Sequence, residues 1–433
     1  MHLSHEKTPH SGQAWLATLT AASFFFYEFI QLNLFNAIDV QLMQDFQINA
    51  VQLGQLASMY FYANALFLFP AGMLLDRYST KKLLLFAITL CTIGTFIFAL
   101  ALHYSVAALA RFLVGWGASF CFLSCIRIAS RWFPAKKMAF VTGIVVTIAM
   151  AGGMVAQTPM ALLSHAVGWR RAVILDGFLG IFIGLAIILF VQDRPPDSHE
   201  AAKAEKDHLK SLGLWRCIFH AVTNTQNWLG GIYTSLLNLP VFLLGALWGI
   251  HYLTEVHHIT TVEASFATTL FFVGIIIGSP IYGWFSDYIG LRRLPMIIGA
   301  VFSLLVIFIL IYTPILSLSS LMILFFLMGF STSSQVLSYP TIAELNPIAL
   351  TSTSVSIASM TIMCSGFIFQ PLFGWMMQLQ WDHQMQNGTP IYSANDFKNA
   401  MWLIPIAFVI GLILSFFIKE TYCRSQEFIA QPA

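Results

Sequence analysis

The chain has 433 residues, of which 58% are hydrophobic and only 9% are charged, and its formal net charge is +2. Because soluble domains carry roughly 25% charged residues, this composition excludes an ordinary water-soluble protein. The small net charge gives no reason to expect nucleic-acid binding, which depends on a basic surface. We therefore expect a membrane protein whose outer surface contacts the lipid bilayer.

Twelve apolar runs follow one another along the chain. Each is long enough to cross a bilayer, which takes about 20 residues. In chain order the predicted spans are 14–38, 52–72, 83–103, 106–128, 139–163, 169–191, 228–252, 264–284, 294–313, 318–340, 351–376 and 399–419. The sequence thus predicts an all-α membrane protein with twelve transmembrane helices.

The basic residues between the spans are distributed unevenly. With the N-terminus in the cytoplasm, 17 of the 21 Lys and Arg residues lie on the cytoplasmic side, and only Arg170, Arg171 and Lys398 lie outside. Such a bias sets the orientation of membrane proteins. We expect both termini in the cytoplasm, no cleaved signal peptide and no disulfide framework, since no predicted outer loop holds a cysteine.

A polar stretch separates the first six spans from the last six. It contains Pro195, Pro196 and a group of charged residues, as linkers do. The predicted organisation is a tail at 1–13, a six-helix bundle at 14–191, a linker at 192–226, a second six-helix bundle at 227–420 and a tail at 421–433.

Glu28 lies in the first span, about 14 residues in and therefore roughly 20 Å deep at 1.5 Å per residue. A carboxylate near the membrane midplane is costly unless it is paired, hydrated or protonated, and such residues mark transport pathways. Tyr27 and Gln31 extend a polar stripe beside it. We interpret Glu28 as a proton-binding or substrate-contacting residue; the alternative is a static ion pair that locks two helices.

A charged segment after the second span returns 211 positions later, after the eighth span. The residues of interest in the two copies are Gly72, Asp76, Arg77 and Lys81, and then Gly283, Asp287 and Arg292. A second pair of segments, 131–134 and 344–347, repeats at an offset of 213. Repeats at half the chain length predict a duplicated helical unit.

Two more charged residues lie within predicted spans. Arg111 is about five residues from the outer end of the fourth span, and a long side chain can reach from there toward the midplane, so it is the natural partner of Glu28. Asp176 lies in the sixth span. We expect it to pair with Arg170 or Arg171, with a place on a proton path as the alternative.

The second half has no charge at the position that corresponds to Glu28. Pro240 stands there instead and removes a backbone hydrogen bond in mid-helix. A helix broken at mid-depth indicates a binding site. Uncharged polar residues nearby and in the tenth and eleventh spans are candidates for the wall of a substrate cavity, or alternatively for contacts between helices. These candidates are Asn238, Ser334, Gln335 and Gln370.

The motifs together resemble a known family. The segment 72–82, echoed at 283–293, resembles the signature of the major facilitator superfamily between helices 2 and 3. Arg111–Gly117 is similar to the family's Arg-x-x-x-Gly-x-Gly motif, and Gly168–Arg170 is also common there. The resemblance covers the whole chain. It implies two six-helix bundles related by a pseudo-two-fold axis, with a substrate cavity between them.

The resemblance also implies roles for individual residues. Arg111 would tune the protonation of Glu28 and support the bundle. Asp76 and Asp287 would clamp neighbouring helix ends and favour the state that is open to the outside, so they would act in gating rather than in substrate binding.

These observations predict a secondary active or facilitative transporter that moves a small polar metabolite by alternating access, with proton-coupled uptake as the favoured mode. An organic anion or zwitterion is favoured because Arg111 offers a cation. Exporters of the superfamily often carry a Gly-Pro pattern in helix 5. In this chain Ala156 and Gln157 interrupt that pattern, which favours uptake or facilitation over export. The alternatives are a proton-driven multidrug or siderophore exporter and a non-transporting membrane receptor.

No nucleophile–base arrangement, phosphate-binding loop or metal-ligand spacing is visible in the sequence. We therefore expect no enzyme activity, cofactor or metal. We expect a monomer in a bacterial inner membrane, and its partners would be a small-molecule substrate, protons and lipid.

Overall fold

The structure is a computed structural model that describes residues 11–133, 138–194, 219, 221–313, 316–346, 351–386 and 389–423. Most of the predicted linker at 192–226 and of both predicted tails lies outside these residues. The side chains of Asp76 and Arg77, which belong to the first predicted gating motif, also lie outside the described part.

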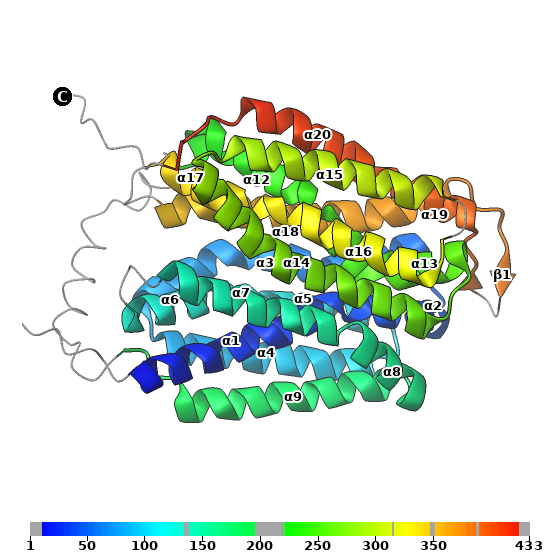
Figure 1. Cartoon of the computed structure of the whole chain (residues 1–433). Helices are drawn as coiled ribbons and strands as arrows, with labels where there is room; N and C mark the ends of the chain where they lie inside the picture. The colour runs from blue at the N-terminus through cyan, green and yellow to red at the C-terminus, as the bar shows by residue number, and fades with distance from the viewer. Residues whose placement is uncertain are drawn as a thin grey trace, which may run out of the picture.

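The described part of the first half is a series of helices (Figure 1). They are α1 (Ser11–Asn33), η1 (Leu34–Ala37), α2 (Asp39–Phe46), α3 (Ala50–Arg77), α4 (Thr80–Leu100), α5 (Tyr104–Ala118), α6 (Cys121–Trp132), α7 (Met138–Val155), α8 (Thr158–Val167) and α9 (Trp169–Phe190).

The second half adds one small β-hairpin to a similar series. Its elements are α12 (Thr225–Leu237), the π-helical segment η3 (Val241–Trp248), α13 (Gly249–His257), α14 (Thr261–Ile289), α15 (Arg293–Tyr312), α16 (Leu318–Thr332), η4 (Ser333–Leu337), α17 (Ser338–Glu344), α18 (Thr351–Gln378), β1 (Met385–Gln386), β2 (Thr389–Pro390), α19 (Ala394–Met401) and α20 (Leu403–Phe417).

Among the described residues, 11 helices are long and apolar enough to cross a membrane, and they coincide with the predicted spans after the first. The remaining predicted span corresponds to α1, which has 23 residues and runs beside α7. Glu28, Gln31 and Asn33 lower the hydropathy of α1, and all three are buried in the protein rather than exposed. The all-helical membrane fold that the sequence predicts is confirmed.

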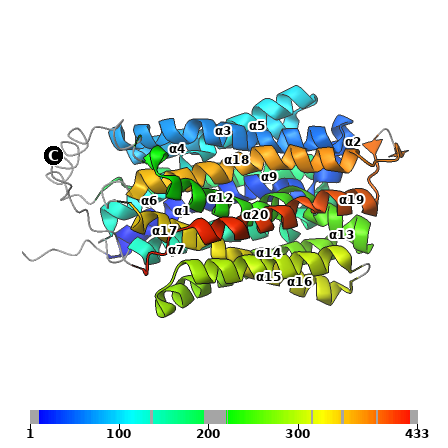
Figure 2. The same cartoon turned by 90° about the horizontal axis from the view of Figure 1, so that it is seen from above.

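All the long helices run along one direction, and the first half lies beside the second (Figures 1 and 2). We call the end where α1 begins and α20 finishes the terminal end. We call the end that carries α2, α13 and the β1–β2 pair the hairpin end. Large apolar side chains such as Phe182, Leu189 and Leu66 are exposed on the outside of the helices. Such a surface suits contact with lipid.

The halves are joined mainly by the pairs α3 with α18 and α7 with α14, and the shorter helix α8 also contacts α14. At the first of these contacts Gly54 of α3 lies against the backbone of Gln370 and Pro371 in α18. Glycine allows two helix backbones to approach this closely because it has no Cβ. The other main contacts of the long helices lie within one half.

Each half contains an equivalent helix cap at the terminal end, which sequence reasoning did not find. In the first half, the carboxylate of Asp193 accepts a hydrogen bond of 2.6 Å from the backbone N–H of Lys81, at the start of α4. In the second half, Glu420 accepts from the N–H groups of Arg292 at 2.8 Å and Arg293 at 2.9 Å, at the start of α15. Each acid lies three positions after the last residue of the final helix of its half, which is Phe190 in α9 and Phe417 in α20. A carboxylate at a helix N-terminus satisfies free N–H groups and the helix dipole.

The cap at Glu420 predicts a pH-dependent stability. Burial by itself raises the pKa of Glu420, but the N–H groups of Arg292, Arg293, Tyr422 and Thr421 outweigh it and hold this pKa below its ordinary value. A lowered pKa stabilises the fold above the unfolded-state pKa, and the gain is lost as the pH falls through the folded-state pKa. Glu420→Gln should therefore cost about 1 kcal/mol at neutral pH, as loss of a helix cap does.

The measurement is thermal unfolding in detergent, followed by tryptophan fluorescence. The difference between wild type and Glu420→Gln should shrink when the pH is lowered below about 4, where a free Glu is protonated. Asp382→Asn, which changes an exposed acid, is the control. An equal difference at both pH values would mean that the ionised carboxylate is not responsible.

Candidate functional site

The predicted site residues of α1 lie on one buried face of the helix. Tyr27 has 0% of its surface exposed, Gln31 2% and Glu28 4%. Within the described part of the chain, Glu28 forms no ion pair, and its Oε2 is buried without a hydrogen-bond partner. Buried polar atoms are nearly always satisfied by protein, water or a ligand. This carboxyl is therefore available for a proton, a water molecule or a polar ligand.

Arg111 of α5 lies within electrostatic range of Glu28 but does not form an ion pair with it. Its Nη1 donates a hydrogen bond of 2.9 Å to the carbonyl oxygen of Gln31. The guanidinium carbon lies 4.6 Å from the ring centre of Phe35 and 5.2 Å from that of Tyr60, so it makes cation–π contacts with both. A static salt bridge between the two charged residues, the alternative considered for Glu28, is not formed in this structure.

Tyr27 and Gln31 connect α1 to the outer helices of the first half. The Tyr27 hydroxyl is 2.9 Å from Oγ1 of Thr95 in α4. The side-chain amide of Gln31 donates to Oδ2 of Asp176 in α9, and Asp176 is buried. These two residues thus fix α1 in the bundle and do not contact the side chain of Glu28 through any hydrogen bond.

The prediction that Asp176 pairs with Arg170 or Arg171 is wrong. Arg170 instead lies 3.4 Å from Asp45 and donates to the carbonyl oxygens of Ala99 and Ala101. The reason is helical geometry. Five or six residues correspond to about 500° or 600° of rotation, so neither arginine shares a face of α9 with Asp176.

Three buried polar atoms around Arg111 have no hydrogen-bond partner. They are Oε2 of Glu28, Nε of Arg111 and the hydroxyl of Tyr60. Together they join α1, α3 and α5, and we call these three residues the acid–arginine cluster. A cluster of opposite charges with free donors and acceptors suits the binding of a proton and of an anionic group, because both can replace missing partners.

In the second half, the structure brings two of the predicted cavity residues together. The Gln335 side-chain amide donates a hydrogen bond of 3.0 Å to Oδ1 of Asn238, and both residues are half-buried. Asn238 follows α12, and after Pro240 the chain continues as the π-helical segment η3. π-Helical turns are frequent at functional sites. The break predicted at Pro240 is therefore present.

The other two candidates take part in helix packing. Ser334 is fully buried, and its hydroxyl lies 3.2 Å from that of Tyr233 inside the second half. Gln370 is also buried, and its side-chain amide donates a hydrogen bond of 3.0 Å to the carbonyl oxygen of Phe242 in η3. Gln370 thus supports the irregular helix, and its Oε1 has no partner.

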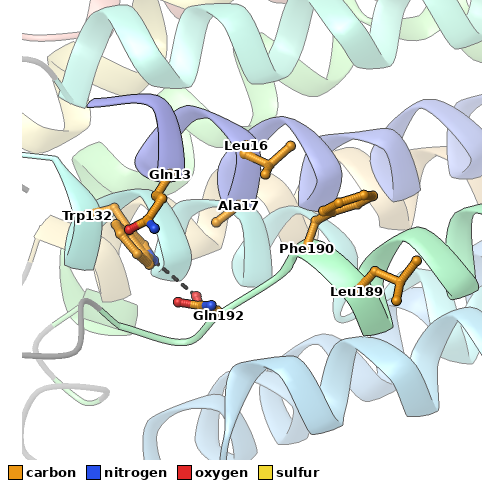
Figure 3. A pocket seen from close by; sticks show the side chains of 7 residues that line it. All are labelled: Gln13, Leu16, Ala17, Trp132, Leu189, Phe190 and Gln192. Carbon is orange, nitrogen blue, oxygen red and sulfur yellow. Dashed lines mark hydrogen bonds between the residues drawn. The ribbon is translucent and has the colours of Figure 1, made fainter. Parts of the chain in front are cut away.

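The pocket in Figure 3 lies away from these residues, at the terminal end between α1, α6 and α9. It has a volume of about 120 Å³ and is lined by Gln13, Leu16, Ala17, Trp132, Leu189, Phe190 and Gln192. The indole N–H of Trp132 donates to the carbonyl oxygen of Gln192 at 3.0 Å. None of the predicted site residues lines this pocket.

A polar network that sequence reasoning did not find joins the halves near the hairpin end. The side-chain amide of Asn36 donates to Gln157 at 2.7 Å and to the carbonyl oxygen of Leu244 at 2.9 Å, and its Oδ1 accepts from the N–H of Ile250 at 2.9 Å. Gln157 donates to the carbonyl oxygen of Gly245 at 2.9 Å. The two side chains therefore bind backbone groups in and just after η3, which is part of the other half.

Further cross-half contacts lie toward the same end. Thr158 lies 2.9 Å from Thr269, the N–H of Ala50 donates to the Tyr392 hydroxyl at 2.9 Å, and Asp39 contacts His251. The hydrogen bonds that join described residues of the two halves all lie toward the hairpin end. The structure is therefore closed at that end.

Arg292, Asp287 and Lys81, for which the sequence predicts a gating role, form contacts within their own halves. Arg292 lies 2.7 Å from both Asp287 and Glu344, so it links the ends of α14, α15 and α17. Burial by itself lowers the pKa of Arg292, but the bonds to Glu344 and Asp287 raise it above its ordinary value. Lys81 donates from Nζ to the carbonyl oxygen of Ile188 at 2.7 Å.

The two glycines of the motifs make few contacts. A Cβ on Gly283 would meet nothing within 4 Å, and one on Gly72 would meet only the side chain of Leu123, at 3.8 Å. Neither glycine is therefore required for a close approach of helices in this conformation.

The family model described as Major Facilitator Superfamily matches residues 19–244 and again residues 232–429. The chain belongs to the major facilitator superfamily. The resemblance predicted from the motifs is thus confirmed, and the same family model matches each half of the chain.

The chain is distantly similar to several proteins of the superfamily. It is 22% identical to the hexuronate transporter of Bacillus subtilis over 57% of this chain and 58% of that protein. It is 22% identical to the probable hexose phosphate transport protein of Chlamydia pneumoniae, over 57% and 59% of the two chains. It is 24% identical to the membrane sensor protein UhpC of Escherichia coli, over 58% and 60%. The alignments thus span less than two thirds of these relatives.

A solved structure of similar fold is that of a bacterial homolog of the human lysosomal transporter Spinster, in an inward-facing and unoccupied conformation. The TM-score is 0.78, with 17% sequence identity, and the match covers 94% of this chain and 97% of that one. At this identity the match shows the fold alone. Since it covers 94% of this chain, it extends over both halves.

Proposed function

We propose that this superfamily member is a secondary transporter that moves a small organic anion across a bacterial inner membrane by alternating access, together with protons. The observation that carries the proposal is the acid–arginine cluster, in which Glu28 and Arg111 are both buried and lie within electrostatic range of each other without an ion pair. A fixed salt bridge would be enough to stabilise helices. Free partners instead suit ligands that come and go.

The proton would bind to Glu28. A buried carboxylate near mid-depth is costly when charged, so it gains from a proton or from a nearby cation. Arg111 is that cation. When a substrate anion engages Arg111, the electrostatic support for ionised Glu28 weakens, and this favours uptake of a proton together with the anion.

The relatives support an anionic substrate. Their names include hexuronate, hexose phosphate, sulfoacetate and galactarate or D-glucarate, all of which carry carboxylate, phosphate or sulfonate groups. The half-buried amides of Asn238 and Gln335 would bind the neutral part of such a molecule from the other half. A zwitterion would fit the same charges.

Alternating access requires that the halves part at one end while they meet at the other. With the termini in the cytoplasm, as the basic residues favour, the hairpin end faces outward and the structure is closed to the outside. Opening would break the Asn36–Gln157 network and close the terminal end. We further propose that the protein acts as a monomer.

The test is uptake into proteoliposomes that contain the purified protein, with and without an inward proton gradient. The panel should contain sugar acids, sugar phosphates, sulfonates, amino acids and neutral hexoses. Accumulation of anions that rises with the gradient would support the proposal. Preference for neutral hexoses, or loss of substrate from the vesicles against the same gradient, would contradict it.

One relative favours a second candidate function. UhpC is named a membrane sensor protein, so a receptor role on this fold is the alternative. A sensor would bind an anion, and binding would be detected by tryptophan fluorescence. It would show neither net uptake nor exchange of labelled for unlabelled substrate across the vesicle membrane.

A further inference from the structure

A single pair of titratable side chains joins the two halves at the hairpin end among the described residues. Nδ1 of His251, in α13, lies 2.9 Å from Oδ2 of Asp39, the first residue of α2. Both side chains are nearly buried, with 8% and 5% of their surfaces exposed. A titratable pair at a moving interface couples proton binding to opening and closing.

We propose that Asp39 and His251 form a second proton-binding site, which holds the hairpin end closed when the imidazole is protonated. This rests on the alternating-access part of the proposed function, because the pair must separate when that end opens. It does not depend on the identity of the substrate or on the role of Glu28.

The surroundings of the imidazole fit this role. Its second nitrogen, Nε2, lies 4.0 Å from Oε1 of Glu255, one turn further along α13. The rings of Phe397 and Trp248 lie 5.0 Å and 6.4 Å from the imidazole, centre to centre. Each nitrogen therefore faces a carboxylate, while aromatic rings keep the pair away from water.

Other charged groups on the neighbouring elements have different partners. Asp396 of α19 accepts hydrogen bonds from the N–H and the hydroxyl of Ser393. Lys398 of α19 is within electrostatic range of His257 rather than of His251. Glu263 of α14 caps its own helix at Thr260.

Asp45 of α2 lies close to Arg170, and η1 and η3 carry no ionisable side chain. Within the described part of the chain, the charge state of His251 thus depends mainly on Asp39 and Glu255, and Asp39 is the member that belongs to the other half.

Protonation of His251 is coupled to opening of the hairpin end because opening changes the contacts of the imidazole. With a neutral imidazole the contact is a hydrogen bond, whereas with a second proton it becomes a buried ion pair, which is a stronger contact. When the halves separate, His251 keeps Glu255, which is in the same helix, but loses Asp39. A proton on His251 thus stabilises the closed end more than the open end, and acid should shift the population toward closure.

The experiment measures the distance between spin labels at Gln44 in α2 and at Gln384 beside the β-hairpin, both exposed positions at the hairpin end. It uses the full chain in lipid nanodiscs, with the native cysteines replaced. For the otherwise unchanged protein, the ratio of short to long distances should rise at least about five-fold between about pH 8 and about pH 5.

Two variants separate the proposal from its alternatives. His251→Gln keeps a side-chain donor for Asp39 but cannot take up a proton, so most of the pH dependence should be lost while a closed population remains. Asp39→Asn should also remove most of the pH dependence of the distance. His258→Gln changes an exposed histidine at the end of α13 and should leave the dependence intact.

Glu28→Gln distinguishes this site from the proposed transport site. If Glu28→Gln removes the pH-dependent change in distance and His251→Gln does not, the second proton site is overturned, although proton-coupled transport still stands. If no substrate of the panel is transported but the distance still depends on pH through His251, the transport proposal fails and this one stands. If the distance does not change with pH in the protein without these substitutions, the second proton site is also overturned.

Discussion

Glu28→Gln should abolish the accumulation of substrate that an inward proton gradient drives, while exchange of labelled for unlabelled substrate continues. A gradient of about one pH unit supplies about 1.4 kcal/mol per proton, which supports about ten-fold accumulation. The glutamine has nearly the same shape and keeps an oxygen beside Arg111, but it cannot bind and release a proton. Accumulation should therefore fall to the equilibrium level. The measurement is labelled substrate inside proteoliposomes at the plateau of uptake.

The matched control is Asp176→Asn, which changes the other described buried acid that contacts α1. The asparagine can still accept a hydrogen bond from Gln31, so coupling should survive. If Glu28→Gln accumulates substrate as the wild type does, Glu28 is not the coupling residue. If Asp176→Asn loses coupling instead, the proton path runs through α9 and the assignment moves to Asp176.

Gly54→Ala should impair transport by preventing full closure of the hairpin end. A Cβ on Gly54 would lie 2.6 Å from the carbonyl oxygen of Gln370 and 2.9 Å from Cα of Pro371, both backbone atoms of the other half. A backbone cannot turn aside as a side chain can, so α3 and α18 would have to separate. Overpacking of this kind costs about 1–3 kcal/mol, which corresponds to a shift of about 5- to 150-fold toward the open state.

Alanine is a better helix former than glycine by about 1 kcal/mol, so the substitution by itself should stabilise α3. A loss of transport therefore reports on the contact between halves. Gly143→Ala in α7, where a Cβ would meet nothing within 4 Å, is the matched control and should keep its transport rate. Initial uptake rates and the distance between labels at Gln44 and Gln384 are the readouts. Normal transport with an unchanged distance would show that the close approach at Gly54 is not needed.

The main features of the fold could be predicted from the sequence because a bilayer imposes a simple rule. A segment that crosses lipid must satisfy its own backbone and present apolar side chains over about 20 residues. Eleven of the predicted spans therefore appear as long apolar helices, and only α1 is less apolar. Two of the polar residues that set α1 apart, Glu28 and Gln31, also belong to the candidate site that the sequence identified.

The predictions for individual residues were correct in some cases and wrong in others. Glu28 was found because a charge in an apolar run stands out, and Pro240 because proline cannot continue a helix. The meeting of Asn238 with Gln335 was anticipated only as a shared wall. The pairing of Asp176 was predicted wrongly because distance along the chain was used where rotation around the helix decides.

What the sequence by itself determined is the class of protein, its helices and the superfamily, since these depend on hydropathy and on local motifs. The tertiary structure alone decided which polar residues meet. Nothing in the sequence marks Asn36, Asp39 and His251 as contact residues. Each gains a partner in the other half only because the two halves pack together at the hairpin end. Asp193 and Glu420 likewise become caps only when the end of one helix comes to the start of another. Contacts between residues far apart in the chain depend on helix rotation and packing, which a hydropathy pattern does not specify.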